Sequence, residues 1–264
     1  MGKLTDMIAQ ARRAQSGGGI GFVGKNKTPS KPRAAALVVE FSTIDAGNAE
    51  SAIKAGADGV LFTCNGEDAS SLETLKQATD AAQASGEKVA SGLHITGGWD
   101  KLECENFEHF KEQGVNFIVL PLHAPARLLA LQVKDLELVV AVPMQEGDMY
   151  PLFIRNLAAF DNLAAVLLDF SLTGNVGSMS IEDVLRYRAV REAVRFPALL
   201  NVKAGLSEAD AYTLLTLGIQ AVILAASAND ATTNKQIKTL RELLEKVHHD
   251  EKETMTGLTN RAQS

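Results

Sequence analysis

The chain has 264 residues, 46% of them hydrophobic, which suits one domain with a full core. Its net charge of -6 argues against a nucleic-acid partner, because phosphate backbones attract basic surfaces. No apolar stretch reaches the roughly 18–20 residues of a membrane span, so no membrane partner is expected. The mixed charges of residues 1–15 argue against a signal peptide, and there are only two cysteines, so a reduced, cytoplasmic protein is expected.

Residues 1–33 are expected to form a separate N-terminal segment. Leu4–Gln15 has helical spacing and predicts an extra helix, which is followed by a connector rich in Gly and Lys at 16–33. The connector contains the pattern G-x-G-x-x-G at Gly19, Gly21 and Gly24. A dinucleotide-binding turn needs a strand before these glycines and a helix after them, and neither is predicted. The connector is therefore interpreted as flexible or as a subunit-contact arm, and the second reading would imply a homo-oligomer.

A unit that recurs about eight times fills residues 34–250. Each unit has a short apolar run, a polar loop and a helical segment. Continuous apolar runs are typical of strands buried on both faces, and their alternation with helices indicates a parallel sheet. Eight units predict an α/β fold, a closed (β/α)8 TIM barrel, with the N-terminal helix at its amino-terminal mouth and a flexible tail at 251–264. The runs are Ala34–Ser42, Ala57–Cys64, Lys88–Thr96, Val115–His123, Leu136–Pro143, Leu163–Ser171, Ala198–Gly205 and Ile219–Ser227.

Several helix ends are also marked in the sequence. Ser180 and Ser207 each precede acidic residues, which predicts an N-cap followed by acids that suit the helix dipole. Glycines at the ends of four helical segments predict left-handed C-caps, at Gly56, Gly86, Gly114 and Gly218.

Polar side chains interrupt the apolar runs in their carboxyl-terminal halves. Burying an unpaired polar group is costly, and scattered structural groups would not be expected to choose one end of the strands. The clustering therefore predicts a site at the carboxyl-terminal mouth of the barrel. The residues are Glu40, Thr63, Cys64, His94, His123, Asp169, Asn201, Lys203 and Ser227.

Glu40, His94 and Lys203 come from odd-numbered strands, whose inward side chains share a layer in such barrels. A carboxylate, an imidazole and an amine form an acid/base set, so these three are predicted to be catalytic, with Asp169 and His123 beside them. The structural alternative is a buried Glu40–Lys203 ion pair. For Asp169, a plain salt bridge with Lys203 is as well supported as catalysis.

Lys203 has two chemical roles open to it. It could form an imine with a carbonyl substrate if its amine were desolvated, or it could hold a carboxylate or phosphate as a fixed cation. The second role is favoured, because nothing in the sequence indicates desolvation. The two cysteines have no metal-ligand spacing, so no metal site is predicted.

The segments around Lys203–Ser207 and Ile219–Ser227 resemble the closing part of the phosphate-binding TIM barrels. This ribulose-phosphate-binding group includes indole-glycerol-phosphate synthase and the thiamine-phosphate synthases. The resemblance implies that backbone amides after the last two strands hold a phosphate. The matching positions are Gly205, Leu206 and Ser207 in the first loop and Ala226 and Ser227 in the second.

The chain departs from that group at two glycines. The group usually has Gly-Gly after strand seven and Gly-Ser after strand eight, where this chain has Ala204-Gly205 and Ala226-Ser227. The extra methyl groups narrow the room for a phosphate. Flavin-dependent barrels hold the FMN phosphate in the same region, so FMN stays open as a cofactor.

These observations predict an enzyme that runs lyase- or isomerase-type acid/base chemistry on a small anionic, phosphorylated carbonyl metabolite. Two alternatives remain at this stage. One is an FMN-dependent oxidoreductase, and the other is a catalytically silent barrel that serves as a binding or assembly module. The fold alone does not separate them, because this barrel hosts many chemistries.

Overall fold

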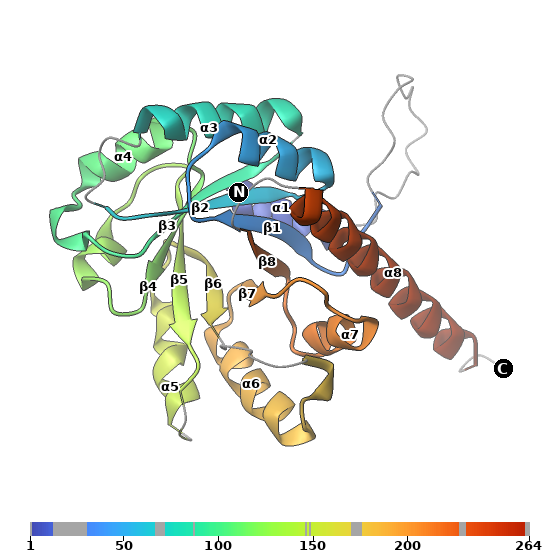
Figure 1. Cartoon of the computed structure of the whole chain (residues 1–264). Coiled ribbons are helices and arrows are strands. Elements are labelled where there is room, and N and C mark those ends of the chain that lie inside the picture. The colour runs from blue at the N-terminus through green and yellow to red at the C-terminus, as the bar shows by residue number, and fades with distance from the viewer. Residues whose placement is uncertain are drawn as a thin grey trace, which may run out of the picture.

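Eight parallel strands form a closed barrel in which each strand pairs with its neighbours in chain order and β8 pairs with β1 (Figure 1). The structure is a computed structural model that describes residues 2–12, 31–66, 72–86, 88–145, 147, 149–169, 176–226 and 231–261, with side chains up to 249. The predicted (β/α)8 fold is confirmed. The strands are β1 (Ala36–Phe41), β2 (Gly59–Cys64), β3 (Ala90–Ile95), β4 (Phe117–Pro121), β5 (Glu137–Pro143), β6 (Leu163–Asp169), β7 (Ala198–Val202) and β8 (Ala221–Ala226).

Helices follow the strands and surround the barrel. The α-helices are α1 (Lys3–Arg12), α2 (Ala46–Ala55), α3 (Leu72–Ser85), α4 (Cys104–Glu112), α5 (Tyr150–Ile154), α6 (Ile181–Val194), α7 (Glu208–Thr216) and α8 (Ala231–Arg261). Short 3₁₀ helices are η2 (Trp99–Lys101), η3 (Ala126–Ala130), η4 (Arg155–Ala159) and η5 (Val176–Ser178). Helix α8 continues through most of the region predicted as a tail, because no Gly or Pro interrupts residues 231–256.

Two apolar cores lie on opposite sides of the strands. The outer core fills the space between the strands and the surrounding helices, and includes Leu37, Leu93 and Leu224. The inner core fills the barrel, and includes Val38 and Ile223. Because each strand contributes alternate side chains to the two cores, its sequence is apolar throughout, which is why the strands were recognisable as continuous runs.

Helix α1 belongs to the inner core. Its apolar side chains recur at helical spacing and are buried with strand residues at the amino-terminal end of the barrel, such as Ala36 and Phe117. Glu137, at the start of β5, accepts hydrogen bonds from the Leu4 amide at 2.7 Å and the Thr5 amide at 3.2 Å. A carboxylate at a helix N-terminus is favourable for both the orphan amides and the helix dipole. The helix therefore closes the amino-terminal mouth.

Most of the helix caps predicted from the sequence are present in the structure. Ser180 and Ser207 form capping boxes with Asp183 and Asp210, respectively, as their positions predict. Three of the four predicted glycines have positive φ, at Gly56, Gly114 and Gly218. The prediction for Gly86 is wrong: a Cβ there would lie 2.7 Å from a methyl group of Ile53 and 2.8 Å from one of Val89, so close packing explains this glycine instead.

Some sequence features lie outside the described residues. They include the glycines of the G-x-G-x-x-G pattern, most of the connector at 16–33, residues 170–175 and the predicted phosphate contact Ser227. Within the part of the chain that is described, none of the helices is both long enough and apolar enough to cross a membrane.

Candidate active site

A carboxylate, an imidazole and a hydroxyl meet at the carboxyl-terminal end of the first three strands. Nδ1 of His94 lies 2.7 Å from Oε1 of Glu40, and the Thr63 hydroxyl donates to the same oxygen at 3.0 Å. The side chains of His94 and Glu40 are 20% and 14% exposed, respectively. The two residues predicted to lead acid/base chemistry are therefore in direct contact, although they are 54 positions apart in the chain.

Strand register and a missing side chain position this pair. Thr63 is the register partner of His94, and Glu40 is the register partner of Ala225 on β8. In β3, two residues before His94, Gly92 leaves space that the ring of Phe117 fills; a Cβ at Gly92 would lie 2.3 Å from that ring. The Glu40–His94 pair thus lies above apolar side chains of the barrel interior, such as Phe117.

A cavity of about 390 Å³ opens above the pair. Small side chains leave this space, since Ala225 and Ala226 at the end of β8 project only methyl groups. Hydroxyl groups add hydrogen-bonding capacity without charge. The cavity is lined by Glu40, Ser42, Thr63, His94, Thr96, Ala225 and Ala226.

The geometry determines which nitrogen of His94 is available for chemistry. A neutral imidazole carries one N–H, and the Glu40 carboxylate favours placing it on Nδ1. Nε2 is then left with a lone pair, so it can accept a proton from a substrate and return it later. A carboxylate in this position can orient an imidazole ring and stabilise an imidazolium, as in other carboxylate–histidine pairs.

Lys203, the third predicted catalytic residue, lines a second cavity of about 300 Å³. It lies just after β7 in a turn that includes Gly205, whose φ is +84° and whose Cβ position faces open space. A second cation, Lys235 in the second turn of α8, lines the same cavity. Both cavities border β8, with Leu224 in one and Ala225 in the other. Leu224 belongs to the outer core, so the lysine cavity lies between β8 and α8, whereas the acid/base pair lies on the inner side of the barrel.

The predicted phosphate loops are split by the structure. Gly205 and Leu206 line the lysine cavity, whereas Ala226 lines the Glu40–His94 cavity. Ser207 makes a different contact. Its amide and hydroxyl both donate to Oδ2 of Asp210, at 2.7 Å and 2.6 Å. A capping carboxylate therefore occupies the N-terminus of α7, where the prediction placed an anion.

The two remaining predicted residues lie at other points of the rim. The ring of His123 contacts Trp99 edge-on, with centroids 5.0 Å apart. The imidazole is exposed and is not among the described residues that line either cavity. Asp169 ends β6 and is exposed, and its carbonyl accepts from the Met144 amide at 2.9 Å. None of the contacts described here joins Asp169 or His123 to the Glu40–His94 pair.

Thr63 and Lys235 belong to the site, although the sequence had given neither a catalytic or binding role. Thr63 was recognisable as a polar residue near a strand end, but only the pairing of β2 with β3 places it against Glu40. Lys235 sits near the start of the helix after β8, a position that points to the carboxyl-terminal mouth of any such barrel. Among the residues described here, no cluster of three or more His, Cys, Asp or Glu side chains is arranged to hold a metal.

No protein-family model matches the sequence, and no curated protein sequence does. Solved structures do match. A variant of the citrate synthase SbnG has a TM-score of 0.52 at 14% identity, over 83% of this chain and 95% of that one. A cube-shaped protein cage designed by fusing symmetric oligomeric domains has a TM-score of 0.59 at 13% identity, over 87% of this chain and 79% of that one.

A third similar structure is the carboxyl transferase domain of Rhizobium etli pyruvate carboxylase, solved with pyruvate and biocytin. It has a TM-score of 0.52 at 10% identity, over 80% of this chain and 47% of that one. At these identities the comparisons establish the barrel fold and nothing finer, because one barrel architecture hosts many unrelated activities.

Proposed function

We propose that this barrel is an enzyme of lyase or isomerase type that moves a proton on a small anionic carbonyl metabolite. The observation that carries the proposal is the 2.7 Å contact between Glu40 and His94 beneath a cavity at the carboxyl-terminal mouth. In TIM-barrel enzymes this mouth is where active sites lie. Nε2 of His94 is the proton acceptor. Glu40 orients the imidazole ring and stabilises its protonated form.

The two lysines of the second cavity are the reason for proposing an anionic substrate. Lys203 and Lys235 line one space beside the turn at Gly205, so a carboxylate or phosphate held there would leave the rest of the molecule near β8. Open space at Gly205 allows a ligand to approach the backbone closely. We assign the phosphate end of a phosphorylated substrate to this cavity rather than to the α7 N-terminus, where Asp210 would repel it.

Two of the similar structures guide the choice of test compounds, although they establish only the fold of this chain. One is named as a citrate synthase, and another was solved with pyruvate, which is a small anionic carbonyl compound. They support the choice of panel below, while the residues of this chain support the mechanism.

The test uses the purified full chain and a panel of small 2-oxo acids and phosphorylated ketones and aldehydes in D₂O. Proton NMR follows exchange of the hydrogen next to the carbonyl group. The wild-type chain is expected to accelerate exchange for at least one compound. His94→Ala should lower that rate about 10²–10⁴-fold, the usual contribution of a general base. His109→Ala on α4, which removes an exposed histidine near Glu112, is the matched control and should leave the rate unchanged.

Lys203 variants then test how the anion is held. Lys203→Met should weaken substrate binding about 10–100-fold, as expected for loss of a hydrogen bond to a charged group, and Lys203→Arg should restore part of it. Borohydride with the active compound should trap no adduct, because Lys203 acts as a cation. A trapped adduct at Lys203 would show that this residue forms an imine with the substrate instead of holding its anionic group. Exchange that is equally fast in His94→Ala, or a yellow protein with flavin absorption, would contradict the acid/base proposal.

A further inference from the structure

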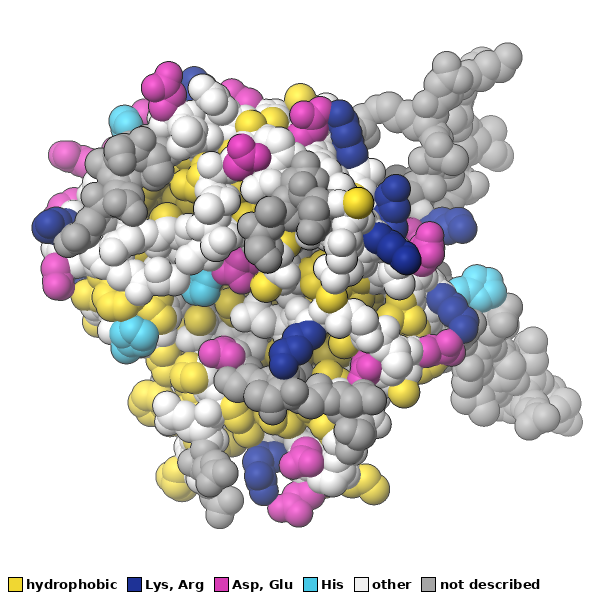
Figure 2. Space-filling view, viewed as in Figure 1, with side chains coloured by type: hydrophobic (Ala, Val, Ile, Leu, Met, Phe, Trp, Pro, Cys, Tyr) yellow, Lys and Arg dark blue, Asp and Glu magenta, His cyan; other side chains and the backbone are white. Residues whose placement is uncertain are grey.

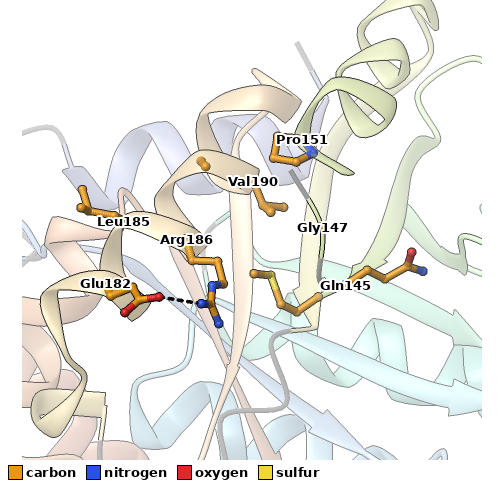
Figure 3. Close-up of a pocket in the computed structure, with 9 residues that line it drawn as sticks. Gln145, Gly147, Pro151, Glu182, Leu185, Arg186 and Val190 are labelled. Atoms are coloured by element: carbon orange, nitrogen blue, oxygen red, sulfur yellow. Dashed lines mark hydrogen bonds and ion pairs between the residues drawn. The ribbon is translucent and has the colours of Figure 1, made fainter. Parts of the chain in front are cut away.

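A groove separates α5 from α6 on the outside of the barrel, away from the strands' inner face. Its volume is about 590 Å³, the largest of the cavities described above. Met144, Pro151, Leu185 and Val190 form apolar walls, and the groove also reaches Gln145, Glu182 and Arg186. Figure 3 shows Pro151 and Val190 near one end of the groove and the Glu182–Arg186 pair near the other.

Large apolar side chains project into solvent on the two helices beside the groove. One group lies at α5, after Gly147, and the other lies in the first half of α6. Figure 2 shows apolar side chains over the part of the molecule where Figure 1 places these two helices. Contiguous apolar surface of this kind marks interaction sites. The exposed fractions are 71% for Met149, 54% for Leu152, 62% for Phe153, 82% for Ile181 and 63% for Leu185.

Helix α6 has apolar residues on both sides. Val190 and Val194 are buried against the barrel, whereas Ile181 and Leu185, one turn apart, are exposed. A helix that packs only on its own barrel needs one apolar stripe, and the second stripe is not covered by any of the described residues. The face therefore has both a concave apolar groove and convex apolar side chains beside it.

The charges at the groove are self-complementary. Glu182 and Arg186 lie one turn apart and form an ion pair at 2.9 Å, with both side chains at least half exposed. If a second copy packs with its α6 antiparallel to the first, Glu182 of each copy faces Arg186 of the other. A two-fold interface requires this reciprocity, since any contact between two positions occurs twice.

We propose that the α5–α6 face is the interface of a symmetric homodimer, in which exposed apolar side chains of each copy enter the α5–α6 groove of the other. The five exposed side chains present on the order of several hundred Å², to be compared with about 800 Å² per partner in a standard interface. The flanking backbone and the charged rim supply the rest. Groove, protruding side chains and both signs of charge on one face favour a second copy over a partner that would need to match only the groove.

Sedimentation velocity of the full chain tests the association. At about 10 µM the wild-type protein is expected to sediment as a dimer, with twice the mass of the 28.2 kDa chain. Leu185→Glu places a charge in the centre of the interface and should weaken association at least about thirtyfold, as hot-spot substitutions do. Tyr212→Glu on α7 is the matched control, because Tyr212 is also a large exposed side chain, at 38%, and lies outside the face.

Charge reversal tests the antiparallel arrangement. Arg186→Glu places two acids opposite two acids and should weaken the dimer, whereas Glu182→Arg combined with Arg186→Glu restores opposite charges across the two-fold axis and should recover it. Because the swap also restores the ion pair within each helix, mixing Arg186→Glu chains with Glu182→Arg chains separates the two effects. Each helix then carries like charges, so only pairing across the two-fold axis favours the mixed dimer. Circular dichroism and thermal unfolding of each variant verify that the barrel stays folded.

Crosslinking tests the location independently. The pairing of Glu182 with Arg186 centres the axis near residue 184, so Leu185→Cys should form an intermolecular disulfide under mild oxidation. The wild-type chain, which keeps its half-buried Cys64 and Cys104, and Tyr212→Cys should not. A monomeric wild-type chain, or a dimer that persists in Leu185→Glu and does not crosslink in Leu185→Cys, would overturn the proposal.

Discussion

Oε1 of Glu40, on β1, accepts a hydrogen bond from the Thr63 hydroxyl on β2 and lies 2.7 Å from Nδ1 of His94 on β3. The carboxylate therefore orients the imidazole, while Thr63 restrains the carboxylate. We expect this contact to favour the hydrogen on Nδ1, which leaves Nε2 as the proton acceptor. This tautomer is the main determinant of what the site can do, because a proton acceptor works only where its lone pair points at the substrate.

The tautomer of His94 is directly measurable. In long-range ¹H–¹⁵N NMR spectra of the neutral protein, His94 should carry its hydrogen on Nδ1, with His94→Gln identifying the signals. Glu40→Ala removes the acceptor and should abolish that preference. Thr63→Val should keep the tautomer but lower the free energy of unfolding by about 0.5–1.5 kcal/mol, the value of one hydrogen bond. A wild-type Nε2–H tautomer would contradict the assigned roles.

Asp210 should make stability depend on pH in the acid range. Burial alone would raise its pKa, but hydrogen bonds from the Ser207 hydroxyl and from the Gly177 and Ser207 amides outweigh burial and hold the pKa below 3.8. A carboxyl with a depressed folded pKa stabilises the protein fully above its unfolded pKa. That stabilisation is lost as pH falls through the folded value.

Asp210→Asn should therefore cost about 1.5–3 kcal/mol at pH 7, and the difference from wild type should shrink below about pH 4. Urea unfolding at several pH values measures it. Asp183→Asn is the matched control: Asp183 forms the same capping box on α6, but its hydrogen bonds lie at the surface, so its loss should be smaller. A pH-independent difference for Asp210 would show that the charge is not involved.

Substitutions of Arg33 and Asp58, which form an ion pair, should have strongly non-additive effects on the free energy of unfolding. Both side chains are almost buried, and Asp58 also accepts from the Leu37 amide at 2.9 Å. Burial lowers the pKa of Arg33 and raises that of Asp58, so each charge depends on the other. Asp58→Asn leaves the guanidinium uncompensated and should cost about 3–5 kcal/mol.

Adding Arg33→Met to Asp58→Asn should recover part of the stability that Asp58→Asn loses, because no buried charge then remains. Thermal and urea unfolding of the two single variants and the double variant give the coupling energy. Strictly additive losses would show that the two charges do not interact. Arg33 has further unpartnered nitrogen atoms within the described structure, Nε and Nη1, which makes its charge costly once Asp58 is neutral.

Gly92 should tolerate no side chain. A Cβ there would overlap the Phe117 ring at 2.3 Å, so Gly92→Ala should lower the free energy of unfolding by about 1–3 kcal/mol. Phe117→Leu in the Gly92→Ala background should recover part of the loss. Gly97→Ala is the control, since its Cβ would make an ordinary 3.7 Å contact with Asn65. Equal unfolding curves for Gly92→Ala and wild type would mean that the ring moves aside freely.

The sequence by itself determined the barrel, the N-terminal helix and the serine caps. These features depend on local patterns: strands buried on both faces are apolar at every position, α1 repeats Leu4, Met7 and Ile8 at helical spacing, and a serine followed by an acid caps its own helix. The sequence also placed polar groups at the carboxyl-terminal strand ends, where the structure brings Glu40, Thr63 and His94 together beside a cavity.

Only the tertiary structure decided which of those polar groups meet. Strand register brings Thr63 and His94 to Glu40, and it leaves His123 against Trp99. Lys203 follows the last residue of β7, so the turn rather than the strand directs it, and it joins Lys235 in the second cavity. Side-chain direction at a strand end is set by contacts with elements distant in sequence, and no periodicity along one chain records those contacts.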